Sequence, residues 1–165
     1  MNETYVEWLV KRKNTVKGLL MRALFILLIV ACVGVFLFFG IIGLMAEVIV
    51  CFITYNVFIS TSVEYEYCYL TGELIIDKVM GRVKRKRCVS IDMDTVELVA
   101  PRGNKELEAL LGKCNKTSDY STLMDLSTVY TVIFRKDSDV LRVDFEPNEK
   151  MIDAMQMQYP RKVIK

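Results

Sequence analysis

The chain has 165 residues, of which 53% are hydrophobic and 25% charged, with a formal net charge of +2 that gives no electrostatic reason to expect nucleic-acid binding. Histidine is absent, which excludes zinc sites of the Cys/His type and acid–base catalysis by histidine. The five cysteines are scattered and include no CxxC pair, so we expect neither a disulfide framework nor a metal site.

The N-terminal segment, residues 1–16, precedes the first apolar run. Tyr5 and Trp8 are three apart and would share one face of a helix, where aromatic rings favour the headgroup level of a membrane. Glu3 and Glu7 would oppose docking on anionic lipids, and the start of the first span is the alternative interpretation. The candidate membrane-interface residues of this juxtamembrane segment are Tyr5, Trp8, Lys11, Arg12 and Lys13.

A 41-residue apolar stretch from Leu19 to Ile59 contains only two charged residues, Arg22 and Glu47. Crossing the roughly 30 Å hydrocarbon core takes about 20 helical residues, so the stretch is long enough for two spans. Glycines lie at its midpoint, in the sequence FGIIG at 39–43, and glycine tolerates the positive φ of a tight reversal. We therefore predict a two-helix transmembrane hairpin over residues 17–60, with a turn near 39–43.

Other interpretations of this stretch are less consistent with its length. A single tilted span over residues 23–46 would leave the apolar residues 48–59 to be buried in the domain beyond, and a cleaved signal peptide would be much shorter. The box before Cys32 is similar to a lipoprotein signal, but apolar residues follow it where a polar tether is expected.

Two charge features of the stretch bear on topology and function. Five cations, Lys11, Arg12, Lys13, Lys17 and Arg22, lie beside the first span, whereas the turn has none. The positive-inside rule then predicts a multi-pass protein of the cell membrane with both termini in the cytoplasm. Glu47 is a functional candidate by its depth, but a helix beginning near residue 44 would put it in the first turn, close to water.

Residues 61–165 are enough for one compact domain, and the 17 basic and 17 acidic residues from Ser60 onward balance. Alternating apolar residues predict a strand over 63–69 that returns through Thr71-Gly72 into residues 73–79. A third strand over 85–92 and a fourth over 95–99 are expected after Gly81.

The second half of the domain is predicted to mix strands with two short helices. Residues 105–111 favour a helix closed by Gly112, residues 115–125 a polar loop, and residues 128–134 and 140–145 another hairpin. Residues 146–149 are expected to begin a terminal helix, with Pro147 in its first turn and Pro160 ending it. An apolar stripe on this helix would pack on the sheet, and its residues are Met151, Ile152, Met155 and Tyr159.

This order of elements resembles small two-span bacterial membrane proteins that carry a cytoplasmic pleckstrin-homology-like (PH-like) domain. Local similarity lies at Met1–Glu7, at Val63–Asp77, and at Phe145–Met151 with Pro160-Arg161-Lys162, so the resemblance covers nearly the whole chain. It implies an α+β fold in which an antiparallel, bent β-sheet is capped by the C-terminal helix and leaves its loops free to bind. It carries over no catalytic residue.

Six cations within ten residues form the densest charge feature of the domain: Lys78, Arg82, Lys84, Arg85, Lys86 and Arg87. In a domain held at the inner leaflet, each cation near anionic lipid contributes about 1 kcal/mol, so the cluster is a candidate lipid- or partner-binding site. The alternative is a solvated hairpin tip balanced by Asp77, Asp92 and Asp94.

The sequence therefore predicts a non-enzymatic, membrane-anchored interaction or scaffold protein, whose PH-like domain contacts anionic headgroups of membrane lipids or a protein partner. The alternative is an accessory subunit or regulator of a larger membrane complex, or a homo-oligomer, assembled through the helical hairpin, where Gly34, Gly40 and Gly43 permit close packing. No nucleotide-binding loop or metal-binding pattern appears, and we expect no catalytic site, no cofactor and no nucleic-acid partner.

Overall fold

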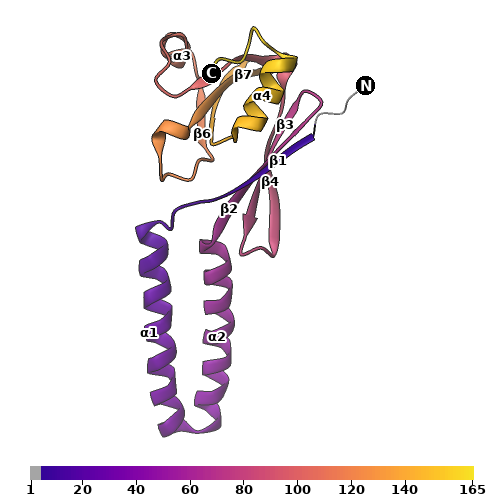
Figure 1. The fold of residues 1–165 in the computed structure, drawn as a ribbon. Coiled ribbons are helices and arrows are strands. Elements are labelled where there is room, and N and C mark those ends of the chain that lie inside the picture. The colour runs from indigo at the N-terminus through magenta and orange to yellow at the C-terminus, as the bar shows by residue number, and fades with distance from the viewer. Residues whose placement is uncertain (1–4) are drawn as a thin grey trace. The chain divides into compact units, whose positions relative to one another are not determined.

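The computed structural model describes residues 5–165, so Met1–Thr4 of the N-terminal motif lie outside the described residues. The chain forms two compact units (Figure 1). The helical unit comprises Asn14–Val63 and Met80–Lys84. The sheet unit comprises residues 5–13, Glu64–Val79 and Arg85–Lys165.

The helical unit is built on two apolar helices, α1 (Val16–Phe39) and α2 (Ile41–Thr61), that run side by side (Figure 1). Gly40 alone connects them, with a φ of 59° that glycine adopts without strain. Their close approach depends on Gly43, where a Cβ would lie 2.5 Å from the Cα of Phe36. The predicted hairpin is confirmed, and both helices are long and apolar enough to cross a membrane.

At the open end of the hairpin, Arg22 joins the two helices. Its Nε donates to the Thr61 Oγ1 at 2.7 Å, and its guanidinium lies 5.3 Å from the centroid of the Phe58 ring. Arg22 is six residues into α1 but contacts the last residue of α2. A Cβ at Gly18 would also lie 3.6 Å from the Cβ of Thr61, so the last turn of α2 packs beside the first turn of α1.

Glu47 does not lie in the first turn of its helix, and that prediction is wrong. Because α2 begins at Ile41 rather than near residue 44, Glu47 lies about 9 Å along the axis from the first residue. Its Oε1 accepts a weak hydrogen bond from the Cys51 Sγ at 3.8 Å, one turn further on.

The first sheet has the strand order β1-β2-β3-β4. Three of its strands were predicted and are confirmed: β2 (Val63–Leu70), β3 (Glu73–Met80) and β4 (Lys84–Asp92). The alternation in β2 buries Tyr65, Tyr67 and Tyr69 to an exposed fraction of 3% or less on the core face, and Glu64 and Glu66 on the opposite face are also buried.

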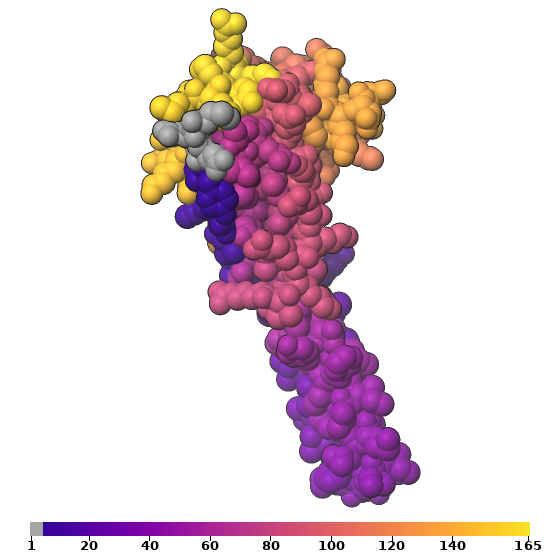
Figure 2. All heavy atoms as spheres, turned by 90° about the vertical axis from the view of Figure 1, so that its right-hand side faces the viewer, coloured from indigo at the N-terminus to yellow at the C-terminus, as the bar shows by residue number. Residues whose placement is uncertain are grey.

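The fourth strand of this sheet, β1 (Tyr5–Lys11), corrects the prediction of a helical interface segment. It pairs antiparallel with β2, with Trp8 opposite Tyr67 and Lys11 opposite Glu64. Residues three apart in a strand point to opposite faces, so Tyr5 and Trp8 do not share one. The aromatic and β-branched residues of this segment suit a strand. Whether they form one depends on pairing with β2, which follows the apolar stretch in the sequence. Figure 2 shows β1 in indigo on the surface beside the magenta strands.

The second sheet has the order β5-β7-β8-β6. The predicted hairpin is confirmed as β7 (Tyr130–Lys136) and β8 (Asp139–Phe145), and the expected fourth strand is β5 (Val96–Pro101). Residues 116–119 are not part of a loop, because β6 (Lys116–Asp119) pairs parallel with β8. Its sequence KTSD has no apolar alternation from which a strand could be predicted.

The core lies between the two sheets and under the terminal helix α4 (Glu149–Gln158). Tyr67 from the first sheet meets Phe145 from the second edge to face, with centroids 5.6 Å apart. Met151, Ile152 and Met155 are buried as predicted, whereas Tyr159, the fourth residue of the predicted stripe, follows the end of α4 and is half-buried.

The ends of the short helices follow the cap residues. Asn148 caps α4 by accepting from the Met151 N–H at 2.8 Å, so Pro147 precedes the helix instead of lying in its first turn. The predicted α3 (Lys105–Leu111) follows β5 and is capped by Asn104. Two 3₁₀ turns, η1 (Met93–Thr95) and η2 (Leu126–Thr128), complete the described elements.

Candidate functional site

The predicted basic residues lie on the β3–β4 hairpin. At its reversal the Val83 N–H donates to the Met80 C=O at 3.1 Å, and Gly81 and Arg82 have φ values of 56° and 59°. Two successive positive φ values define a type I′ turn, whose twist matches that of the flanking strands. Glycine accepts this conformation freely, whereas Arg82 incurs a strain on the order of 1 kcal/mol.

The tip of this hairpin, Met80–Lys84, packs against the end of α2 within the helical unit. The Gly81 N–H donates to the Ser62 C=O at 2.8 Å, and a Cβ at Gly81 would lie 3.0 Å from the Cα of Ile59. Ile59 is almost fully buried. The tip, which carries Arg82 and Lys84, is therefore fixed to the last turn of α2.

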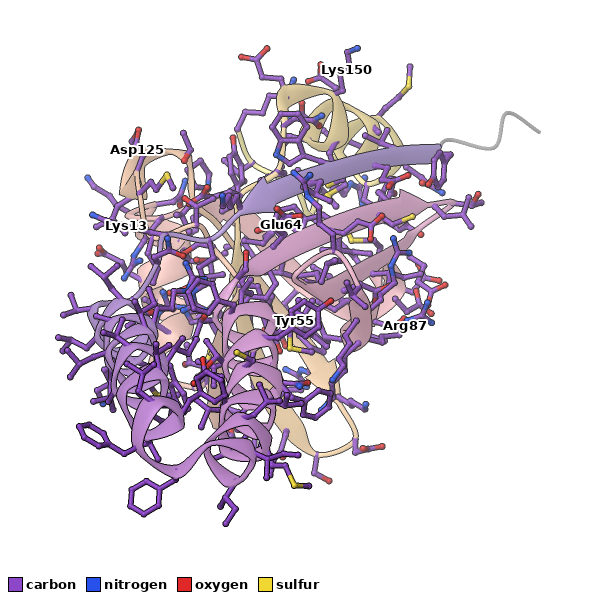
Figure 3. The ribbon with its side chains drawn as sticks, turned by 90° about the horizontal axis from the view of Figure 1, so that it is seen from below. Lys13, Tyr55, Glu64, Arg87, Asp125 and Lys150 are labelled. Carbon is purple, nitrogen blue, oxygen red and sulfur yellow. The ribbon has the colours of Figure 1, made fainter. Side chains whose placement is uncertain are left out.

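The other four predicted cations, Lys78, Arg85, Lys86 and Arg87, belong to the sheet unit. Arg85 pairs with Glu66 at 2.5 Å and Arg87 with Asp77 at 3.5 Å; Figure 3 labels Arg87. Alternation along β4 puts Lys84 and Lys86 on the face opposite to these arginines. Within residues 5–165, no ion pair involves Lys84 or Lys86.

Acidic side chains of β1, β2 and β3 lie near Arg85 and Arg87 and offset much of their positive charge. Glu7 and Glu66 share a hydrogen bond that raises the pKa of Glu66 and lowers that of Glu7. The Tyr5 hydroxyl donates to Glu7 at 2.5 Å, and this bond raises the pKa of Tyr5 to about 12. The alternative of local charge balance thus holds in part: Asp77 pairs with Arg87, whereas Arg85 pairs with Glu66 of β2, and among the described residues no ion pair involves Asp92 or Asp94.

The candidate membrane-interface residues do not form one surface. Arg12 is half-buried, and its Nη1 donates to the Tyr65 hydroxyl at 2.5 Å. The Lys13 N–H donates to the Thr122 C=O at 2.9 Å, and Tyr5 bonds to Glu7. The remaining two, Trp8 and Lys11, line a shallow groove of about 490 Å³ together with Met124 and other residues. Their contact with a membrane stays a prediction.

The prediction of a polar loop over 115–125 missed three exposed apolar residues near its end. Leu123, Met124 and Leu126 have exposed fractions of 41%, 64% and 58%. Three large apolar side chains within four residues of an otherwise polar segment were the available signal. We call Ser121–Thr128 the apolar loop.

The described residues hold no recognisable reaction centre. Burial raises the pKa of the Cys68, Cys88 and Cys114 thiols, which is the opposite of what a nucleophilic thiolate needs. No group of three or more Cys, Asp or Glu residues within 5–165 is arranged to hold a metal ion.

Comparison with known proteins agrees with this fold. Neither the curated proteins nor the solved structures contain a match to the chain. A family model described as a bacterial PH-like domain, DUF6106, matches residues 2–165. PH-like domains are generally non-catalytic, so this match indicates an interaction domain, and the two apolar helices fit a two-span membrane protein. The chain belongs to the bacterial PH-like domain family DUF6106.

Proposed function

We propose that this protein is a non-enzymatic, membrane-anchored interaction protein that contacts anionic headgroups at the inner leaflet. The contact is made by the β3–β4 hairpin with its six cations, which we call the basic hairpin. The observation that carries the proposal is the packing of the hairpin tip on the last turn of α2, through the Gly81 to Ser62 hydrogen bond. A helix that spans the bilayer ends at the headgroup layer. Arg82 and Lys84 would then lie at that layer.

The charges suit this role. Among the described residues, Lys84 and Lys86 form no ion pair, so their charge is available to a ligand. Each lysine or arginine near an anionic leaflet contributes about 1 kcal/mol, and the attraction falls off within a Debye length. A few such contacts are enough to orient a domain that the helices already hold at the membrane.

The test uses the full chain in lipid nanodiscs with one tryptophan at the tip. Trp8, the only tryptophan of the chain, is changed to Phe, and the exposed Val83 is changed to Trp. We expect a headgroup nitroxide to quench this tryptophan more strongly in discs that contain phosphatidylglycerol than in zwitterionic discs. The difference should shrink at 1 M salt, where the Debye length is about 3 Å.

Matched charge reversals identify the residues that respond to anionic lipid. Lys84→Glu with Lys86→Glu should abolish the effect of anionic lipid on quenching. Lys113→Glu with Lys116→Glu changes the net charge equally at exposed positions outside the hairpin and should preserve it. Quenching that ignores lipid charge and salt would reject the lipid proposal and favour a protein partner or a complex assembled through the helices.

A further inference from the structure

The apolar loop exposes side chains that a solvated loop has no reason to expose. Leu123 and Met124 follow Thr122, and Leu126 begins η2. These three side chains are 41–64% exposed. An isolated exposed leucine is ordinary, but three within four residues form an apolar patch of the kind that marks a contact site.

Hydrogen bonds hold the loop in one conformation. The N–H and the Oγ1 of Thr122 both donate to the Glu146 Oε1, at 3.1 and 2.8 Å, and Glu146 is buried. The Met124 N–H in turn donates to the Thr122 Oγ1 at 3.1 Å. These bonds support Leu123 at a φ of 63°. A loop that is already ordered loses little entropy on binding.

A hydrogen bond ties this loop to the segment of chain that leads into the first membrane helix. The Lys13 N–H donates to the Thr122 C=O at 2.9 Å, and Figure 3 shows Lys13 and the loop residue Asp125 on the same margin of the sheet unit. Only two residues separate Lys13 from Val16, the first residue of α1. A linker of this length spans about 10 Å at most, so the membrane surface lies within reach of the loop.

We propose that the apolar loop is a second membrane contact, which inserts Leu123, Met124 and Leu126 at the boundary between headgroups and acyl chains of the bilayer that anchors the chain. This inference rests on the membrane anchoring in the proposed function, but it concerns a different loop and a different chemistry. The exposed Lys11 and Lys13 add cations near an anionic surface.

Asp125 sets the depth of insertion. Its Oδ1 accepts from the N–H and the Oγ of Ser127 at 2.9 and 2.7 Å, and these bonds lower the pKa of Asp125. The ionised carboxylate stays at the headgroup layer, since a charge in the hydrocarbon core is costly. The neighbouring apolar side chains therefore enter only the boundary region.

The test places a single tryptophan on the loop of the full chain, as Leu126→Trp in the Trp8→Phe background, in nanodiscs of phosphatidylcholine with bromine at shallow or deep acyl positions. We expect a blue-shifted emission and quenching that is strongest for shallow bromine. The same substitution at Met157, which is 90% exposed on α4, is the control and should show neither effect. Met124→Trp provides a second loop position if Leu126→Trp folds poorly.

The outcome is independent of the basic hairpin. Apolar insertion should persist at high salt and in Lys84→Glu with Lys86→Glu, whereas headgroup quenching at Val83→Trp should not. A loop tryptophan that is quenched by acyl bromine no more than the Met157→Trp control would overturn the inference. This result would not affect the proposal that the basic hairpin contacts lipid headgroups, which has a separate test.

Discussion

Gly72 occupies the second position of the β2–β3 turn with a φ of 89°, and a Cβ there would lie 2.7 Å from the Tyr159 hydroxyl oxygen. Gly103 has nearly the same φ, 91°, but no atom within 4 Å of its Cβ position. Gly103→Ala should therefore cost only the backbone strain of about 1–2 kcal/mol. Gly72→Ala should cost more, because Tyr159 must also move.

Thermal unfolding of the full chain in detergent, followed by circular dichroism, measures both substitutions. Tyr159→Phe removes the hydroxyl oxygen that the new Cβ would meet, so in that background Gly72→Ala should lower the melting temperature by no more than Gly103→Ala does. Equal losses in the wild-type background would show that Tyr159 moves aside without cost. Such a double-mutant comparison separates strain from steric contact.

The charge cluster shows what a residue-level sequence analysis misses. Six cations could be counted from the sequence, and their place on a hairpin follows from Gly81 and the flanking alternation. Asp77 was among the acids expected to balance the cluster, but its pairing with Arg87 and the pairing of Arg85 with Glu66 could not be assigned, since ion pairing across strands depends on register. The available charge is therefore smaller than the count, and among the described residues Lys78, Lys84 and Lys86 form none of the ion pairs.

Gly43 decides how closely the two apolar helices approach. Its Cβ position lies 2.5 Å from the Cα of Phe36, which is backbone and cannot rotate away, whereas Gly34 has no atom within 4 Å. Gly43→Leu should therefore destabilise the hairpin by roughly 1–3 kcal/mol, as overpacking does. Gly34→Leu, the matched control, should be tolerated. Melting temperatures in detergent test this prediction, and equal values for the two variants would contradict it.

The apolar helices, the hairpins and α4 could be predicted because their signals are local: length, period and turn residues. β1 could not, since a seven-residue segment with aromatic residues suits a strand or an interfacial helix, and its partner β2 lies more than fifty residues away. β6 is too polar and too short to be recognised. Both strands exist because a neighbouring strand offers them hydrogen bonds.

Removing β1 should destabilise the domain. Without it β2 becomes an open edge, and the buried Val10 no longer covers the core. A fragment of residues 62–165 should therefore unfold without a cooperative transition. Residues 5–13 joined to residues 62–165 by a short glycine- and asparagine-containing loop should restore the transition, because Lys11 and Glu64 already pair at that end. Equal melting curves for the two fragments would rule out a structural role for β1.

The whole molecule has one further constraint on its topology. β1 precedes the helical hairpin and β2 follows it, yet the two strands pair residue by residue. A ladder between them cannot cross a bilayer, so both flanks of the hairpin must lie on the same side of the membrane. This argument gives an even number of crossings independently of hydropathy. The side itself depends on the five cations beside α1, which favour the cytoplasm.

We therefore expect a green fluorescent protein fused after Lys165 to be fluorescent and an alkaline phosphatase fused there to be inactive in a bacterial host. The same two reporters inserted after Gly40 should give the reverse pattern. Replacing Lys11, Arg12, Lys13 and Lys17 by glutamine should weaken this bias, because cations beside a span favour the cytoplasmic side. An active phosphatase at Lys165 in the wild-type chain would place the basic hairpin outside the cell. The inner-leaflet contact would then be impossible, whatever the hairpin binds in nanodiscs.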